Sequence, residues 1–381
     1  MVDRKSKIAI IGAGIGGLTT AISLRQKGFE PVIFERAAEL KPVGAGIVLS
    51  TNAMNALKQL GLAEKVLKSG KAAQSYSIKT DRGDILRKVD IKTYSHQFGY
   101  PSVGITRANL HQILMDALPT KNSLRLGEEF TSINRFSDDF DILIGADGIR
   151  SNVRKALFGN VALKYCNQTG WRGLGPVPKN YDLSHAFEAW GEGKRFGAVQ
   201  VSDNLIYWYV AINEPKDSFK TTEESIKTVI KEQFHGWINP IAELIENTDH
   251  RKIVCDNIFI SPPEKYWFQD KCVLLGDAIH STTPDLGQGA GMAIESGLAL
   301  AHSLESYQNI EEAFKNYQNI RYPRTTWVTK KSGQLAWLAG INNVVLASIR
   351  NSIFKLGNQF VPKWIEEKQF SNLIGYQVDF S

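Results

Sequence analysis

A glycine-rich turn near the N-terminus constrains this chain more than any other feature of its sequence. Residues 7–11 form a short apolar run that leads into Gly12-Ala13-Gly14-Ile15-Gly16-Gly17. Residues 15–27 then carry apolar side chains at helical spacing up to Gly28, and residues 31–35 form a second apolar run. The pattern predicts a strand, a tight turn, a helix and a second strand within about 30 residues.

The glycines of this turn and the acid that follows it suit a dinucleotide. Gly12 permits the tight turn, Gly14 lets a pyrophosphate approach the backbone, and Gly17 lets the helix pack closely on the strand. The N-terminus of the helix offers N–H groups to phosphates. Glu35, at the end of the second strand, can accept hydrogen bonds from both ribose hydroxyls, and its charge disfavours a 2′-phosphate. A turn without a ligand would need only the glycines, so the complete unit favours dinucleotide binding.

A second motif begins where a predicted strand at 141–145 ends. Asp147-Gly148 follows this strand, and Arg150 and Arg154 come next at helical spacing. Taken alone, the segment is typical of a strand-to-helix turn with a solvated basic face.

A third motif follows a predicted strand at 271–275. Asp277 can hold a polyol hydroxyl at the strand end, and the glycines within 284–291 let the backbone lie flat against a planar ring. The helix that comes next would direct its positive N-terminal dipole at that ring. A flexible glycine loop is the alternative interpretation.

Together the three motifs resemble the class A flavoprotein monooxygenases, the para-hydroxybenzoate hydroxylase-like group, over about Ile8 to Arg324. The stretches Gly44–Ile47 and Thr106–Leu110 match that family as well. The resemblance implies a bound FAD, a transient NADH or NADPH, and O2. It implies these cofactor-binding residues: Gly12, Gly14, Gly17, Glu35, Arg36, Gly46, Ile47, Arg107, Asp147, Asp277, Pro284, Gly287, Gln288, Gly289, Ala290 and Gly291.

The implied fold is α/β: a Rossmann-like FAD-binding domain with an inserted β-rich substrate domain and a helical C-terminal part. Frequent glycines and aromatic residues with short alternating runs place the β-rich layer from about residue 164. The expected segments are 1–75, 101–163 and 263–330 for the FAD-binding domain, 76–100 for strands of the substrate domain, 164–262 for the β-rich substrate domain, and 331–381 for a C-terminal helical region.

The substrate side is similar to a subgroup that includes the salicylate hydroxylases and the FAD-dependent urate hydroxylases. The run Gly191–Arg195, the later Tyr207, and residues 280–285 carry this likeness. It implies that Arg195 and Tyr207 face the substrate, and an arginine suits an anionic or carbonyl-rich planar ring. The alternative is a surface arginine and a core tyrosine.

One position departs from the urate enzymes. Those enzymes carry an asparagine before their tryptophan, whereas Gly170 precedes Trp171-Arg172-Gly173 in this chain. The departure puts urate itself in doubt, and Arg172 would either contact a different anionic ligand or lie at the surface.

The implied activity is hydroxylation of a small aromatic or heteroaromatic substrate through a flavin C4a-hydroperoxide formed with NAD(P)H and O2. Two alternatives stay open. One is a monooxygenase that inactivates a polycyclic compound such as a tetracycline, because such enzymes share the fold. The other is a flavoprotein reductase that does not oxygenate, acting on membrane lipid through residues 335–349.

Composition excludes other classes. The 381 residues carry a net charge of +6 with basic residues scattered among acids, which does not favour nucleic acid. There is no apolar stretch of about 20 residues, so a membrane partner is not expected. Three distant cysteines and histidines without ligand spacing predict no metal site and a reducing compartment, here the cytoplasm. We expect a monomer or a homodimer.

Three further expectations concern the C-terminal third of the chain. His280 is interpreted as a structural histidine, and residues 335–349 as a buried or amphipathic helix. A basic group is interpreted as a solvated helix face, with contact to the phosphates of NAD(P)H as a minor alternative; it comprises Arg321, Arg324, Lys330 and Lys331.

Overall fold

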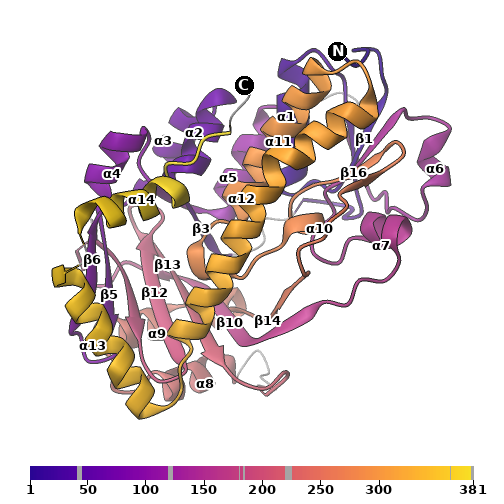
Figure 1. Cartoon of the computed structure of the whole chain (residues 1–381). Helices are drawn as coiled ribbons and strands as arrows, with labels where there is room; N and C mark the ends of the chain where they lie inside the picture. Colours follow the sequence, from indigo (N-terminus) through magenta and orange to yellow (C-terminus); the bar gives the residue numbers. More distant parts are fainter. Residues whose placement is uncertain are drawn as a thin grey trace.

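Two large sheets and a layer of long helices make up the chain (Figure 1). The computed structural model describes residues 1–40, 45–118, 123–179, 181–182, 185–218, 225–360 and 362–378. Gly44 therefore lies outside the described residues.

The first sheet has the strand order β15-β16-β9-β1-β2-β8 and is parallel apart from β15. Its strands are β1 (Ile8–Ile11), β2 (Val32–Glu35), β8 (Leu124–Leu126), β9 (Ile142–Gly145), β15 (Phe268–Gln269) and β16 (Cys272–Leu274). All residues of β1, β9 and β16 are buried, as is typical of parallel strands with both faces covered. The strands predicted at 7–11, 31–35, 141–145 and 271–275 are confirmed.

Helices pack around this sheet. They are α1 (Ile15–Gln26), α5 (Arg107–Asp116), α6 (Asn134–Ser137), α7 (Asn152–Phe158), α10 (Asp277–His280) and α11 (Gly289–Ser306), with a 3-10 turn at Pro284–Leu286. Helix α1 lies along α11, and Gly297 permits this because a Cβ there would meet the Thr20 Oγ1 at 2.8 Å.

The second sheet has the order β14-β10-β13-β12-β11-β5-β6, antiparallel except where β11 pairs with β5. Its strands are β5 (Ser75–Thr80), β6 (Ile85–Asp90), β10 (Lys164–Pro176), β11 (His185–Trp190), β12 (Lys194–Gln200), β13 (Leu205–Asn213) and β14 (Val254–Ile260). Helices α8 (Ile226–Gln233) and α9 (Ile241–Asn247) share a core with Trp171, Phe196 and Trp208 of this sheet. The β-rich layer predicted from composition is thus present.

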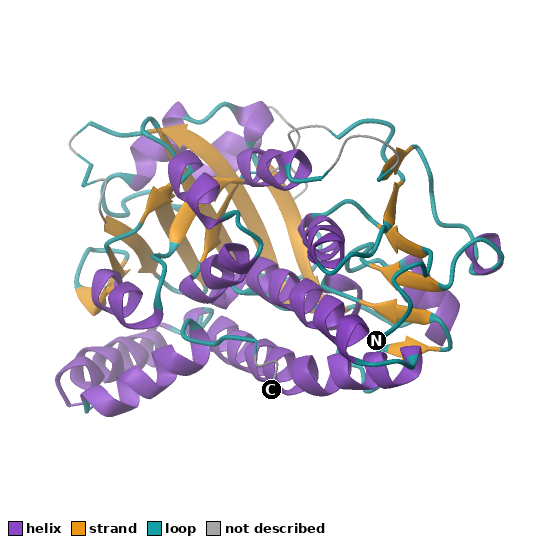
Figure 2. Cartoon of the chain, turned by 90° about the horizontal axis from the view of Figure 1, so that it is seen from above, coloured by secondary structure: helices purple, strands orange, loops and turns teal. Residues whose placement is uncertain are grey.

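A small sheet of β3 (Gly46–Leu49), β7 (Val103–Thr106) and β4 (Lys71–Ala72) contacts the second sheet through β3 and β7. Helices α2 (Thr51–Gln59), α3 (Ala63–Ser69) and α4 (Ile91–Phe98) accompany it, and a 3-10 turn occupies His250–Lys252. Figure 2 shows strands of the second sheet running behind the helices that separate it from the first.

Three helices end the chain: α12 (Ile310–Ala339), α13 (Val344–Phe360) and α14 (Lys363–Leu373). Helix α12 continues through Pro323, and the expected domain boundary at 330 falls inside it. Helix α13 packs beside β6, at the outer edge of the second sheet (Figure 1).

The expectation of one helix over residues 335–349 is wrong. The segment contains the last turn of α12, a break that starts at Gly340 and the first turns of α13. Its amphipathic character is as expected, because Trp337 is 72% exposed whereas Ala339 and Ala347 are 1% and 4% exposed. Within the described residues, no helix is long and apolar enough to cross a membrane, and no cluster of three or more His, Cys, Asp or Glu suits a metal.

The β1–α1 turn yields a stability prediction. A Cβ on Gly17 would lie 2.0 Å from the Gly12 carbonyl oxygen, so Gly17→Ala must push the helix off the strand. We expect this change to lower the free energy of unfolding by about 3 kcal/mol. At Gly14, with φ −73°, a Cβ meets no described atom within 4 Å, so Gly14→Ala should cost less than about 1 kcal/mol. Urea unfolding measures both, and equal losses would contradict the packing argument.

Candidate active site

The glycine-rich turn is held by its own strand-end acid. Gly12 has φ +107°, and a Cβ there would meet the Ala146 carbonyl oxygen at 2.5 Å. The Glu35 Oε2 accepts a hydrogen bond from the Ala13 N–H at 2.8 Å, and its Oε1 accepts one from the Ala37 N–H at 3.0 Å. Each carboxylate oxygen keeps a second lone pair, so Glu35 can fix the turn and still accept a ribose hydroxyl.

Two further side chains lie near this turn. Arg36 is exposed beside Glu35, where an adenine could cover it. His111 of α5 reaches the Ala13 carbonyl oxygen with its Nε2 at 2.9 Å. Sequence reasoning missed His111, because nothing in the spacing along the chain connects it with the turn.

In the structure, the second motif stabilises the start of α7 and contacts the third motif. The Asp147 Oδ2 accepts hydrogen bonds from the N–H groups of Asn152 at 2.7 Å and Val153 at 3.2 Å, at the start of α7. Arg154 is buried and donates to the carbonyl oxygens of Ala278 at 2.8 Å and Ile149 at 2.6 Å. The solvated basic face expected here is therefore wrong for Arg154, which ties the second motif to the third.

Asp277 lies at the start of α10, within the electrostatic reach of Arg107. Its side chain is exposed to solvent, desolvation by the surrounding protein raises its pKa, and the charge of Arg107 lowers it. The fold thus brings together Arg107 and Asp277, which are 170 positions apart in the chain.

In the loop of the third motif, residues 284–291, some residues are exposed and others pack against neighbouring helices. Gly287 has φ +63° in the left-handed region and is exposed, as is Pro284, while Gly289 and Ala290 are half-buried. A Cβ on Gly291 would meet the Asn52 Nδ2 at 3.2 Å, so this glycine brings α11 close to α2.

The Gln288 side chain is hydrogen-bonded to two helices. Its side chain is buried, and its Oε1 accepts hydrogen bonds from the Asn52 Nδ2 at 2.9 Å and the Arg324 Nη2 at 3.3 Å. The loop is thereby fixed to α2 and α12 from behind.

Behind the loop lies a buried ionic network on α11 and α12. The Arg321 Nη2 donates to the Glu295 Oε2 at 2.6 Å, and the Arg321 Nε donates to the Ser296 Oγ at 3.1 Å. The Asn52 Nδ2 donates to the Glu295 Oε1 at 2.5 Å. Arg321 and Arg324 are 0% and 6% exposed, so the interpretation of a solvated helix face is wrong for both.

The C-terminal segment completes this network. The Tyr376 hydroxyl meets the Arg321 Nη1 at 3.0 Å, and the Arg324 guanidinium lies 4.5 Å from the centre of the Tyr376 ring. Arg324 also donates to the carbonyl oxygens of Asn372 and Leu373. Lys330 and Lys331, by contrast, are exposed as expected.

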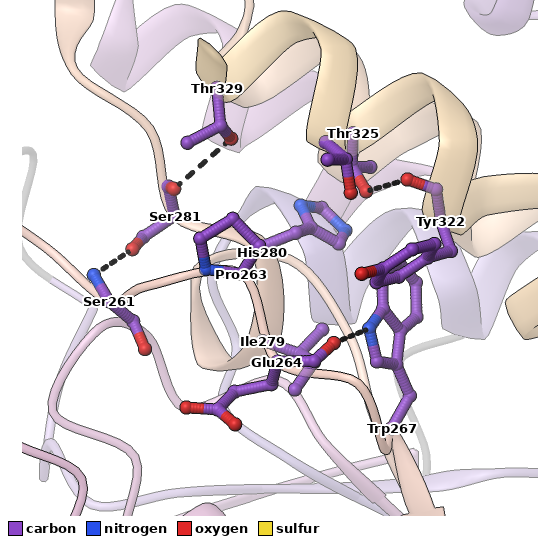
Figure 3. A pocket seen from close by; sticks show the side chains of 11 residues that line it. Ser261, Pro263, Glu264, Trp267, Ile279, His280, Ser281, Tyr322, Thr325 and Thr329 are labelled. Carbon is purple, nitrogen blue, oxygen red and sulfur yellow. Dashed lines mark hydrogen bonds between the residues drawn. The ribbon is translucent and has the colours of Figure 1, made fainter. Parts of the chain in front are cut away.

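His280 has a structural environment. Its Nε2 lies 3.0 Å from the Ser296 Oγ, and burial together with the charge of Arg321 lowers its pKa to about 3, so it is neutral near pH 7. Figure 3 shows the ring beside Trp267 in a small pocket next to α12. This pocket contains none of the predicted cofactor residues.

On the substrate side, Arg195 is buried between two carboxylates. Its Nη2 donates to the Asp285 Oδ1, and its Nη1 donates to the Glu188 Oε1 at 3.4 Å. Burial disfavours its charge, but Asp285 and Glu188 outweigh this effect and raise the pKa of Arg195 further. The surface-arginine alternative is therefore wrong. Among the described residues, the Arg195 Nε and the Asp285 Oδ2 are buried without a hydrogen-bond partner.

Glu188 organises the surrounding aromatic residues. Its Oε2 accepts a hydrogen bond from the Tyr209 hydroxyl at 2.6 Å, and its Oε1 accepts one from the Trp190 Nε1 at 2.5 Å. Burial and the charge of Glu188 raise the pKa values of Tyr209 and Tyr76 well above the ordinary range, so both phenols stay protonated. Sequence reasoning missed Glu188 because it lies in a strand with no motif around it.

Tyr207 contacts the cofactor half of the chain. A Cβ on Gly46 would lie 2.4 Å from the Tyr207 ring, so this glycine lets β3 approach β13, and the adjacent Ile47 is half-buried. Burial raises the pKa of Tyr207 to about 12. Arg172 pairs with Asp256 at the surface, and Gly170 faces Ile258 across the neighbouring strand.

Known proteins resemble this chain in sequence and in fold. The model of the family described as "FAD binding domain" matches residues 5–139 and 139–332. The aurachin C monooxygenase/isomerase of Stigmatella aurantiaca is 32% identical over 92% of this chain and 94% of its own length. The chain belongs to this FAD-binding family. It is an FAD-dependent enzyme of the class A flavoprotein monooxygenases, as the three motifs predicted.

Other relatives include an FAD-dependent urate hydroxylase of Mycolicibacterium vanbaalenii, 31% identical over 84% of this chain and 85% of that protein. Among solved structures, Klebsiella pneumoniae HpxO complexed with FAD and uric acid has a TM-score of 0.85 at 23% identity, covering 97% of both chains. The tetracycline destructase Tet(51) has a TM-score of 0.66 at 20% identity over 94% of this chain and 98% of that one. These structures confirm the predicted fold class.

The buried network behind the loop yields a second prediction. Glu295→Gln removes the counter-charge of Arg321 in the interior, and we expect it to lower the free energy of unfolding by about 3–5 kcal/mol. Glu311→Gln, which breaks the exposed pair with Lys315 on α12, should cost less than about 0.5 kcal/mol. Thermal and urea unfolding compare the two. A loss at Glu295 no larger than that at Glu311 would show that the network is not needed for stability.

Proposed function

We propose that the chain is an NAD(P)H-consuming monooxygenase that hydroxylates a small, uncharged aromatic or heteroaromatic ring. The observation that carries the proposal is the buried Arg195 with Asp285 and Glu188, located where the substrate sheet meets the loop of the third motif. Asp285 lies two positions before Gly287, the first glycine of that loop, so a ring held at this arginine would lie beside a flavin held along the loop.

The described residues fit FAD. The open space at Gly14 and the N-terminus of α1 suit its pyrophosphate, and Glu35 suits the adenosine ribose. Asp277, with Arg107 nearby, offers an exposed carboxylate and a cation that suit the ribityl chain and the phosphates. When bound, FAD supplies the chemistry that accepts reducing equivalents and activates O2, and the hydroperoxide mechanism expected from the sequence is part of this proposal.

The charges around Arg195 favour a neutral ring. One guanidinium faces two carboxylates, so the cluster carries no surplus positive charge for an anionic substrate, contrary to the expectation that this arginine suits an anion. The Arg195 Nε–H needs an acceptor, and the Asp285 Oδ2 needs a donor. A ring that presents a carbonyl oxygen next to an N–H would satisfy both atoms.

The activity itself is tested with purified protein that contains FAD. Ring compounds are screened for stimulated NADH or NADPH oxidation, and products are analysed after reaction under ¹⁸O2. We expect one labelled oxygen atom in the product of a neutral heteroaromatic compound. Reductant consumption that yields no labelled product from any ring would refute the hydroxylase, and turnover of tetracyclines alone would establish the polycyclic alternative.

The role of Arg195 yields a third prediction. Arg195→Lys keeps a charge but loses the planar fork, and we expect kcat/KM for the ring substrate to fall about 100-fold. Flavin content and oxidation of NAD(P)H without substrate should stay unchanged. Arg172→Lys, an exposed arginine paired with Asp256, is the matched control and should change kcat/KM by less than about twofold. Equal effects of the two variants would contradict a role for Arg195 in substrate binding.

The second carboxylate yields a fourth prediction. Matched pairs of ring compounds, with and without a carboxylate, measure charge selection in the parent enzyme and in Glu188→Gln. The parent should prefer the uncharged member, and the variant should reduce that preference about tenfold because one negative charge is removed. A parent enzyme that prefers the anion would show that Arg195 is not neutralised by its two partners.

A further inference from the structure

An apolar surface lies on the C-terminal helices. Of the thirteen large apolar side chains that are exposed among the described residues, eight lie between residues 337 and 364. The α13 face is defined here by Trp337, Val345, Ile349, Ile353, Leu356 and Trp364, each at least 50% exposed. Three of these, Val345, Ile349 and Ile353, follow one another four residues apart along α13 and so share one side of it.

The opposite side of α13 fixes its orientation. The Phe354 ring packs edge-on against Trp190 with 5.1 Å between ring centres. Arg350 is buried and donates to the carbonyl oxygens of Ala339 at 3.1 Å and Gly191 at 3.3 Å. Because these contacts anchor the inner side, the helix cannot turn its apolar side inward without breaking them.

The charge near the α13 face indicates which kind of partner could cover it. Residues 313–365 contain eight Lys or Arg and no Asp or Glu, but Arg321, Arg324 and Arg350 are buried, so only lysines of this stretch can add positive charge to the surface. Lys330 and Lys331 are exposed on α12, and Lys330 lies two helical turns before Trp337 on the same side. Lys355 extends from α13 to Asp84 at 3.4 Å. A second copy of this chain would bring these cations against one another, whereas an anionic surface would complement them.

We propose that the α13 face attaches the enzyme to the surface of an anionic lipid bilayer. A helix with an apolar side and nearby lysines binds in the plane of the interface, and tryptophans favour the depth of the lipid headgroups. Trp337 near the end of α12 and Trp364 at the start of α14 are exposed tryptophans on the helices that precede and follow α13. The attachment is peripheral, and it departs from the expectation of no membrane partner. It depends on neither the substrate nor the hydroxylation chemistry.

The experiment is vesicle co-sedimentation of the full-length, FAD-containing protein. Vesicles of phosphatidylcholine with about one quarter phosphatidylglycerol should bind the parent protein about tenfold more tightly than phosphatidylcholine alone. The double variant Ile349→Asp/Ile353→Asp should lose this binding. Tyr266→Asp places a charge on an equally exposed side chain elsewhere and should bind as the parent does. Lys330→Glu/Lys331→Glu should lower binding to anionic vesicles by about tenfold with the apolar face intact.

Flavin content and circular dichroism confirm that each variant is folded, and the particle mass without lipid is measured in parallel. Binding that survives the double aspartate variant would overturn the proposal. A parent protein that binds no vesicles would also overturn it. If that parent is a dimer and the double variant is a monomer, the face joins two copies of the chain instead. Failure of the hydroxylation assay leaves vesicle binding unaffected, so the two proposals fail independently.

Discussion

The buried ion pairs of Arg195 join the two halves of the site. Glu188 and Arg195 come from neighbouring strands of the second sheet, and Asp285 comes from the loop that leads into α11. A buried guanidinium is tolerated only with its partners in place, so the sheet and the loop cannot separate without leaving uncompensated charges in the interior. Under the proposed function, Arg195 would therefore set the distance between a ring held on the sheet and a flavin held along the loop.

A second set of buried contacts holds the loop from behind. Gln288 is hydrogen-bonded to Asn52 of α2, and Glu295 on the following helix is paired with Arg321 of α12. Tyr376 closes the network from the end of the chain. Segments that are far apart in sequence therefore fix the loop backbone that would face the cofactor. The exposed glycines of this loop are thus supported from the buried side by packed helices.

The correct interpretations concern backbone conformation within short segments. The wrong ones concern charged side chains that turned out to be buried. The turn at Gly12 was predictable because a positive φ and close helix packing can be met by few residue types. Arg154, Arg321 and Arg324 were assigned to solvated faces because helical spacing shows which residues share a side but not what covers it. The carbonyl oxygen that Arg154 contacts lies 124 positions away. The expected boundary at residue 330 falls inside α12, because this helix continues past Pro323 to Ala339.

The sequence by itself determined the dinucleotide unit, the three flavin-type motifs and the β-rich layer, because each depends on residue types within a short span. Only the tertiary structure decided that Arg195 is neutralised by Glu188 and Asp285 and that α13 presents its apolar side outward. The physical reason is the same for both. Burial and net charge at a site are sums over neighbours that the chain brings together from distant positions, and no spacing along the sequence reports them.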